Sequence, residues 1–187
     1  MTCIVGLVDN GSVYIGGDSA GVSGWGLVQR QDRKVFRNGS FVMGFTSSFR
    51  MGQLLAFGFQ PPEIPVGVDV FEFMVTDFVE AVRQRLKDGG FATNKDSAEA
   101  GGEFLVGIGG RLFKVASDYQ VAESIHGFDA CGCADQIALG SLWSTRSRTS
   151  ARRRVSEALE AGEAFSAAVR RPFFIEATTA RAGEVTE

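Results

Sequence analysis

A chain of 187 residues, 44% of them hydrophobic and 22% charged, has the composition of one ordinary globular domain with a substantial core. Its net charge of −3 argues against a general affinity for nucleic acid or an anionic membrane, and no apolar run approaches the roughly 18 residues of a membrane helix. The start, MTCIVGLVDNG, lacks the basic leader of a signal peptide, so we expect a cytoplasmic protein whose cysteines are reduced thiols.

The first half of the chain is predicted to form strands joined by tight turns. Apolar, strand-like runs fall on residues 2–8, 12–17, 33–37 and 40–45. Asn10-Gly11 and Asn38-Gly39 separate these runs in pairs, and this dipeptide favours a two-residue hairpin turn. We therefore expect two β-hairpins before the first helix, which is predicted at residues 48–58.

A longer helix is predicted after the Pro-rich segment 61–67. Asp69 is placed to cap its start and Gly89 to end it. One face of this helix collects the apolar side chains of Phe71, Met74, Val75, Phe78, Val82 and Leu86. Such a stripe indicates core packing.

The second half repeats the alternation of strands and helices. Strands are predicted at 103–109, 111–117 and 119–124, helices at 135–144 and 152–169, and a last strand at 172–177. Two antiparallel sheets packed face to face, each with a helical layer outside, would bury both sets of apolar faces. The pattern therefore predicts an α+β fold, a four-layer αββα sandwich, in a single domain over residues 1–187.

A metal site built from His126, Cys131 and Cys133 is disfavoured by spacing. Zinc ligands usually come in two separated pairs, and the one-residue gap in Cys131-Gly132-Cys133 does not match. We predict no metal and no cofactor, and interpret His126 as a turn residue. The arginines of residues 144–154 are interpreted as a solvated loop and helix start rather than an anion-binding patch.

Three residues carry a resemblance to a known family. Thr2, Asp18 and Lys34 lie at equal intervals of 16 residues, within MTCIVG, IGGDSAG and DRKVFRNG. This start resembles the mature start of a proteasome β subunit and, more closely, of the bacterial HslV peptidase. FVMGFTSS is similar to the Ala-Gly turn of that family before its first helix, and ACGCADQIALGSL to its Gly-Ser-Gly turn before the third. The resemblance covers nearly the whole chain and implies an N-terminal-nucleophile hydrolase.

The resemblance implies a role for each matching residue. Removal of Met1 would make Thr2 the nucleophile, because an N-terminal threonine brings its own α-amine as base. Lys34 would supply an ammonium that keeps this amine unprotonated, Asp18 would orient Lys34, and the backbone N–H of Gly44 would face the oxyanion. Val22, Val42 and Thr46 are predicted to line the substrate pocket.

The chain departs from the family at the proposed site. Cys133 and Ala134 replace the Ser and Gly of the Gly-Ser-Gly turn, so a thiol, the weaker hydrogen-bonding group, stands where a hydroxyl would face the threonine amine. Ser166 and Val169 take the positions of an Asp and a Ser found in proteasome β subunits, a difference that favours an HslV-like relative. Cys133 is itself a competing nucleophile, although His126 is the one histidine that could activate it.

Three functions stay open at this stage. The chain could be an active threonine peptidase, a catalytically silent ring subunit that acts as scaffold, or a hydrolase of small amides. Taken singly, Asp18 and Lys34 could be a surface ion pair, and Gly44 a strand residue that allows close packing. The family implies stacked homo-oligomeric rings of six or seven subunits that act on unfolded protein or peptide, with an ATP-dependent unfoldase as a plausible partner.

Overall fold

Two antiparallel sheets form the centre of the fold in the computed structural model, which describes residues 2–95, 98–148 and 150–178. The four-stranded sheet has the order β12-β1-β2-β13, with bounds Phe128–Gly132, Cys3–Asp9, Ser12–Gly17 and Phe174–Ala177. The five-stranded sheet has the order β11-β10-β9-β6-β5, with bounds Val121–Glu123, Arg111–Val115, Phe104–Ile108, Phe41–Phe45 and Val35–Asn38. All neighbouring strands are antiparallel.

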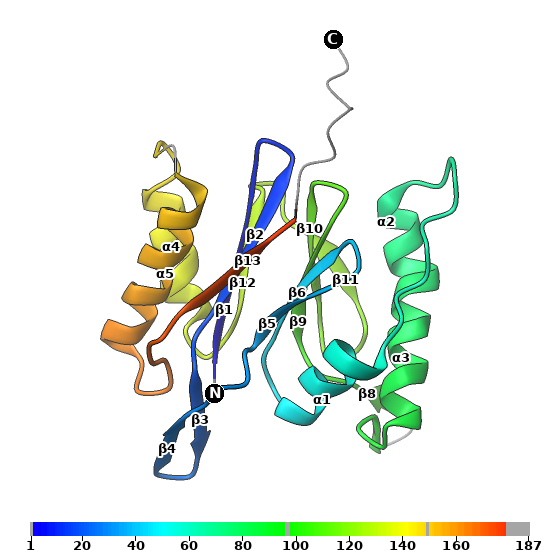
Figure 1. Cartoon of the computed structure of the whole chain (residues 1–187), viewed down its shortest axis with the longest axis horizontal. Helices are drawn as coiled ribbons and strands as arrows, with labels where there is room; N and C mark the ends of the chain where they lie inside the picture. Colours follow the sequence, from blue (N-terminus) through cyan, green and yellow to red (C-terminus); the bar gives the residue numbers. More distant parts are fainter. Residues whose placement is uncertain (1, 96–97, 149, 179–187) are drawn as a thin grey trace.

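A helical layer covers the outer face of each sheet (Figure 1). Helices α4 (Asp135–Ser144) and α5 (Ala151–Phe165) cover the four-stranded sheet. On the other side lie α1 (Phe49–Gln53), which continues as a π-helical turn to Gly58, α2 (Val70–Phe73) and α3 (Val79–Asp88). The predicted four-layer αββα sandwich is confirmed.

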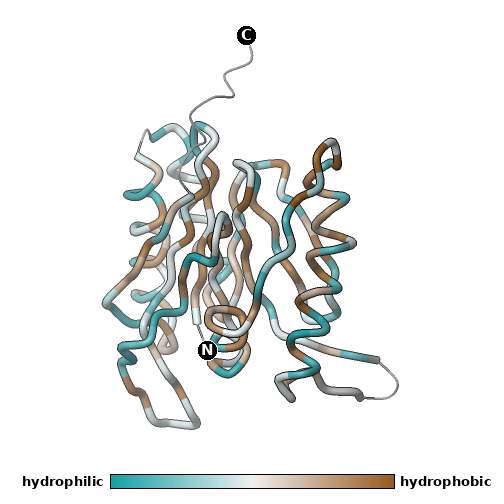
Figure 2. The backbone as a smooth tube through the Cα atoms, turned by 45° about the vertical axis from the view of Figure 1, so that its right-hand side comes forward, coloured by the Kyte–Doolittle hydropathy of each residue, from teal (hydrophilic) through white to brown (hydrophobic). Residues whose placement is uncertain are grey.

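The core consists of three apolar clusters that follow these layers. One lies between each helical layer and its sheet, and a third, which includes Ile4, Ile15 and Val42, lies between the two sheets. The backbone tube in Figure 2 accordingly shows many hydrophobic positions along the central strands, whereas the outer helices alternate between hydrophobic and hydrophilic residues.

The second predicted hairpin turn lies one residue later than Asn38-Gly39, because Asn38 pairs with Phe41 and leaves Gly39, with a φ of 60°, and Ser40 in the loop. The first has the predicted position and conformation: Asn10 and Gly11 have φ of 47° and 72°. Two consecutive positive φ values match the twist of the flanking strands and are readily adopted by Asn and Gly.

The long second helix buries Met74, Phe78, Val82 and Leu86 of its predicted apolar stripe and departs from it at the other two positions. A π-helical turn over Met74–Phe78 follows α2 and inserts an extra residue into the helical repeat. Phe73 is therefore buried in the core, whereas Phe71 and Val75 are 37% and 39% exposed. Asp69 caps the helix start through the N–H groups of Phe71 and Glu72, as predicted, and Gly89 ends it.

Two hairpins and one strand escaped the sequence analysis. The hairpins are β3 (Ala20–Ser23) with β4 (Gly26–Gln29), and β7 (Thr93–Lys95) with β8 (Ala98–Ala100); the strand is β12. The β3–β4 hairpin projects from the end of the sandwich where β1 begins and where α1 also lies (Figure 1). Among the described residues, no helix has both the length and the apolar content needed to span a membrane.

Candidate active site

Asp18 and Lys34 form an enclosed ion pair at the end of the sandwich where β1 begins. Lys34 Nζ lies 2.8 Å from Asp18 Oδ1, and the two side chains are 1% and 0% exposed. The pair is therefore not the surface ion pair that the sequence left open. Burial of two charges is expensive unless further hydrogen bonds satisfy them, so an enclosed pair of this kind is a candidate for function rather than stability.

Backbone donors from three segments satisfy the Asp18 carboxylate. Cys3 N donates to Oδ1 at 3.1 Å, and Ala20 N and Arg170 N donate to Oδ2 at 2.9 and 3.3 Å. Oδ1 thus holds both the ammonium of Lys34 and the peptide N–H that directly follows Thr2. This shared oxygen ties the start of β1 to the ion pair.

Lys34 sits in an environment that disfavours its charged form. Burial lowers the pKa of the Lys34 ammonium below its usual value, and the ion pair and hydrogen bond with Asp18 partly oppose this shift. The ring of Phe49 lies 5.7 Å from Nζ, within the range of a cation–π contact. A cation with a lowered pKa beside a buried carboxylate is suited to influence proton transfer nearby.

Thr2 is held against the turn that follows β12. Its carbonyl oxygen accepts hydrogen bonds from Cys133 N at 2.9 Å and from Cys133 Sγ at 3.3 Å. Gly132 has a φ of 102°, and a Cβ atom there would lie 2.2 Å from the Thr2 carbonyl oxygen and 3.3 Å from Thr46 Oγ1. Only glycine fits this position, and its absent side chain lets Thr2 and Thr46 approach.

Cys133 is exposed and lies between Thr2 and the segment after α5. Its Sγ is 3.8 Å from Ser166 Oγ, whereas the other two cysteines, Cys3 and Cys131, are buried. Burial raises the pKa of Cys3 to about 12 and that of Cys131 well above 9.0, so neither is a thiolate near neutral pH. Val169, the other position compared with proteasome β subunits, is fully buried in the cluster beneath α5.

Gly44 occupies a different environment from the one its predicted role requires. It pairs with Val35 of β5 on one side and Leu105 of β9 on the other, inside the sheet. Thr46 N donates to Glu103 O on the β9 side, and because every second residue of a strand faces the same neighbour, Gly44 N–H points toward β9 as well. A Cβ at Gly44 would lie 2.6 Å from Ile4 Cγ2, so the glycine allows the two sheets to approach.

The backbone turn just beyond β6 offers an N–H group that is better placed than that of Gly44 to face an oxyanion. Ser47 has a φ of 67°, and Ser48 N donates to Thr46 O at 2.8 Å, the features of a γ-turn with positive φ. Such turns are rare and strained, and strained residues concentrate at functional sites. Ser47 N–H has no hydrogen-bond acceptor among the described residues, and Ser47 is exposed next to Thr46. The sequence signal near this donor was the segment FVMGFTSS, which contains Ser47 and was compared with the Ala-Gly turn of the family.

The predicted pocket residues divide between core and surface. Val42 is fully buried in the cluster between the sheets, so its prediction as a substrate contact is corrected to a core residue. Thr46 adjoins Thr2 and Gly132, and Val22 is partly buried in the projecting hairpin.

His126 lies in the turn before β12, as predicted, with its ring against Phe128 and Trp143. In the described part of the chain, no cluster of His, Cys, Asp and Glu side chains could hold a metal ion.

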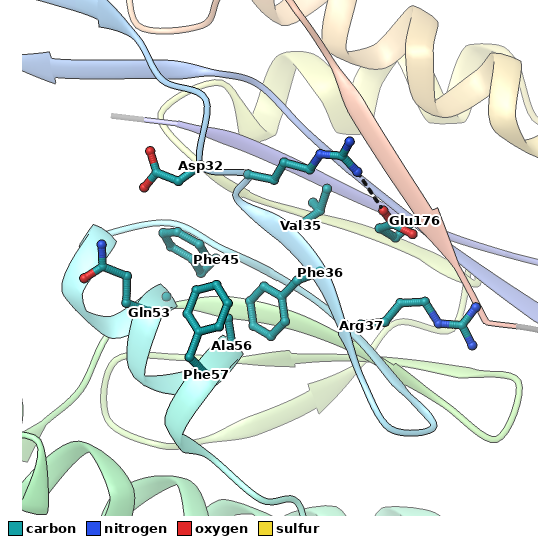
Figure 3. A pocket seen from close by; sticks show the side chains of 11 residues that line it. Asp32, Val35, Phe36, Arg37, Phe45, Gln53, Ala56, Phe57 and Glu176 are labelled. Carbon is teal, nitrogen blue, oxygen red and sulfur yellow. Dashed lines mark hydrogen bonds and ion pairs between the residues drawn. The ribbon is translucent and has the colours of Figure 1, made fainter.

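A separate cavity of about 460 Å³ opens beside strand β5. Figure 3 shows the rings of Phe36, Phe45 and Phe57 gathered on one side and Arg37 on the other, and Arg33 pairs with Glu176 at 3.3 Å on the rim. Thr2, Asp18 and Lys34 do not line this cavity. It is therefore distinct from the candidate active site.

Comparison with solved structures identifies the fold. BPH of Thiobacillus denitrificans superposes with a TM-score of 0.81 at 19% identity, covering 96% of this chain and 99% of that one. HslV of Trypanosoma brucei gives 0.67 at 14% identity, covering 94% and 98%. Anbu of Hyphomicrobium sp. strain MC1 gives 0.66 at 17% identity, covering 96% and 84%.

The chain has the proteasome-like fold of HslV. At these identities the likeness to HslV, BPH and Anbu establishes the fold and leaves the activity to be argued from the site. No protein-family model matches the chain, and no curated protein matches its sequence.

Proposed function

We propose that this protein is a threonine peptidase in which Thr2, made the N-terminal residue by removal of Met1, is the nucleophile. The observation that carries the proposal is the shared oxygen of Asp18, which holds both the buried Lys34 ammonium and the N–H that follows Thr2. A structural ion pair needs no such link to the first residues of the chain. The HslV-like fold supports the same conclusion.

In the proposed reaction, the α-amine of Thr2 takes the proton of the Thr2 hydroxyl as Oγ1 attacks the substrate carbonyl carbon. The same amine then gives this proton to the leaving nitrogen as the C–N bond breaks, which leaves an ester on Thr2. Water hydrolyses the ester, again with the amine as base. An α-amine has a reference pKa of about 7.7 to 8.0, and the nearby Lys34 ammonium favours its neutral, basic form.

The tetrahedral intermediate needs a donor for its oxyanion. We assign this role to the N–H of Ser47, in place of that of Gly44, because the Ser47 N–H is unpaired among the described residues and the turn adjoins Thr46, next to Thr2. Preorganised donors of this kind stabilise the transition state without reorganising during the reaction. Cys133 would orient Thr2 through its contacts with the Thr2 carbonyl.

Three alternative functions differ from the threonine peptidase in what they require of Cys133, of Met1 or of the assembly. A Cys133 nucleophile lacks a histidine base, because His126 lies before the start of β12 and Cys133 lies after its end. A silent scaffold would keep Met1 and leave Thr2 blocked. A small-amide hydrolase would share the Thr2 chemistry but would not need a closed assembly.

We further propose that copies of the chain assemble into stacked rings that enclose the active sites and admit unfolded polypeptides. Large apolar side chains are fully or mostly exposed on the single chain, among them Trp25, Phe57 and Phe165. Exposed apolar groups of this size are typical of surfaces that a partner covers. An ATP-driven unfoldase fits such a chamber as substrate supplier. Native mass spectrometry should show at least a hexamer, and a monomer at micromolar concentration would favour the small-amide hydrolase.

The test of the proposed activity begins with the intact mass of purified protein. Loss of one methionine is expected, and retention of Met1 would favour the scaffold. Hydrolysis of an unstructured peptide library should then be detectable and should stop when Thr2 is replaced. Epoxomicin, which is bound in one BPH structure, is a suitable ligand: its binding should raise the melting temperature of the wild type but not of Thr2→Ala.

A further inference from the structure

Lys114 joins the two sheets beside the candidate active site. It lies on β10 of the five-stranded sheet, and its Nζ donates to Ala130 O on β12 of the four-stranded sheet at 3.2 Å. The same Nζ lies 3.0 Å from Glu103 Oε1. The Lys114 and Glu103 side chains are 24% and 29% exposed, so the pair is largely withdrawn from solvent.

Glu103 in turn holds the turn that carries the Ser47 N–H. Its carbonyl accepts from Thr46 N at 3.0 Å, and its own N–H donates to Ser47 Oγ at 3.1 Å. The Thr46 amide and the Ser47 side chain are therefore both tied to the backbone of Glu103, while the Glu103 carboxylate is tied to Lys114.

On the other sheet, Lys114 contacts β12, and the turn after β12 holds Thr2. Ala130 is two residues before Gly132, and Cys133 donates its N–H to the Thr2 carbonyl. Thr2 precedes β1 of one sheet and Ser47 follows β6 of the other. The distance between a nucleophile and an oxyanion donor must be held within a fraction of an ångström for efficient catalysis. Lys114 links the two supports through Ala130 and Glu103.

We propose that Lys114 is a positioning residue that fixes the Ser47 turn relative to Thr2 through Glu103 and Ala130. This inference rests on the proposed threonine mechanism, and adds to it a residue on β10 outside the Thr2, Asp18 and Lys34 set. We call the contacts of Lys114 with Glu103 and Ala130 the clamp. The clamp affects the geometry of the catalytic groups, so its loss should lower kcat with little effect on KM.

The charges around Lys114 keep the clamp intact at neutral pH. Burial disfavours the ammonium, but the hydrogen bond and ion pair with Glu103, aided by Asp129, outweigh it and raise the pKa of Lys114 above its usual value. Asp129, on β12, has a raised pKa because it is partly buried, with Glu103 and Asp135 adding to the shift and Lys114 opposing it. The ammonium is thus charged whenever the enzyme is expected to work.

The experiment compares Lys114→Met with a matched control on the same strand. Arg111 also lies on β10, and its Nε bonds Glu123 Oε1 at 2.9 Å with side-chain exposures of 30% and 31%, close to those of the Lys114 pair. Arg111→Met therefore removes an ion pair of similar exposure at the opposite end of the strand, together with the 3.1 Å contact of Arg111 with Asp69 at the start of α2. Glu103→Met removes the acceptor of the Lys114 ammonium while keeping a side chain of similar length, and serves if Lys114→Met fails to fold.

Peptide hydrolysis should separate these variants. We expect Lys114→Met and Glu103→Met to lose about 10- to 100-fold in kcat with KM changed by less than about threefold, the loss typical of displaced catalytic geometry. Arg111→Met should keep kcat within about twofold, although we expect the melting temperatures of Lys114→Met and Arg111→Met to fall by a similar few degrees. Equal kcat losses in Lys114→Met and Arg111→Met, or an unchanged kcat in Lys114→Met, would overturn the clamp.

Amide hydrogen exchange tests the clamp even if the wild type hydrolyses no peptide and the proposed function fails. Thr46 N–H donates to the Glu103 carbonyl and Ser48 N–H donates to the Thr46 carbonyl, so the two amides report the order of the turn and of its attachment to Glu103. Faster exchange of these two amides in Lys114→Met, but not in Arg111→Met, supports the clamp. Equal exchange in the two variants would refute it independently of activity.

Discussion

Asp18 Oδ1 accepts hydrogen bonds from Lys34 Nζ at 2.8 Å and, through the same oxygen, from the N–H of Cys3. The pair is enclosed, and removing one partner of a buried ion pair leaves the other uncompensated, which typically destabilises a protein by about 3 to 5 kcal/mol. Apolar side chains of similar volume would pack equally well there. The charges are better explained by chemistry at the adjacent Thr2.

The first prediction separates the Thr2 hydroxyl from Thr2 packing. Thr2 is only 4% exposed, so Thr2→Val, which keeps the volume and removes the hydroxyl, is a sharper change than Thr2→Ala. Both should abolish peptide hydrolysis while the assembly stays intact by native mass spectrometry, and Thr2→Ser should keep measurable activity. Residual activity of Thr2→Val within a few-fold of wild type would remove Thr2 from the mechanism.

The second prediction concerns the ion pair. Lys34→Ala should lower kcat at least about 100-fold, in line with the loss of a group that tunes the base. Asp18→Asn should have a comparable effect, because without the carboxylate the buried Lys34 has no anion to keep it charged. Arg33→Ala, a neighbour whose ion pair with Glu176 is 54% and 28% exposed, is the control and should stay active. A fully active Lys34→Ala enzyme would return the pair to a purely structural role.

The third prediction uses two lysines whose pKa values shift in opposite directions. Burial lowers the pKa of Lys34, so between that lowered value and 10.5 the unfolded chain binds a proton that the folded chain does not. The contribution of Lys34 to the free energy of unfolding should therefore increase as pH rises through this window. The pKa of Lys114 is raised, so its contribution is present below 10.5 and declines as pH rises through the raised value.

Differences in the free energy of unfolding between wild type and each Lys→Met variant check this sign. The difference for Lys34→Met should grow with pH on the alkaline side, and that for Lys114→Met should shrink. Urea titrations at a series of alkaline pH values provide both curves. Two curves with the same slope would contradict the opposite environments of the two ammonium groups.

The layer order could be predicted because it rests on local signals. Hairpin dipeptides such as Asn10-Gly11 set their own turns, and alternating runs of strand and helix leave few ways to bury all the apolar faces. The position of Phe73 could not be predicted, because a π-helical turn shifts the buried face by one residue and leaves no mark in the apolar pattern. Strand β12 was missed because FDACG has the small and polar residues of a turn.

The candidate site was predictable where a motif fixed it and not where tertiary geometry did. The family resemblance carried by Thr2, Asp18 and Lys34 pointed to residues that the fold brings to one end of the sandwich. The choice between Gly44 and Ser47 as oxyanion donor depends on which backbone N–H groups are already hydrogen-bonded to a neighbouring strand. This follows from the register of β6 with β9. Val42 likewise looked like a pocket residue until the sheet packing enclosed it.

The last prediction concerns Cys133, the exposed thiol that contacts Thr2. Its Sγ lies 3.3 Å from the Thr2 carbonyl oxygen, and a hydroxyl donates a stronger hydrogen bond than a thiol, so Cys133→Ser should preserve or raise peptide hydrolysis. Alkylation of the native protein should reach Cys133 alone, because Cys3 and Cys131 are buried, and the added group should block the site; peptide mapping checks the position. Activity lost in Cys133→Ser but kept in Thr2→Val would instead make Cys133 the nucleophile. Activity that appears only in Cys133→Ser would mean that the natural chain is a silent ring subunit.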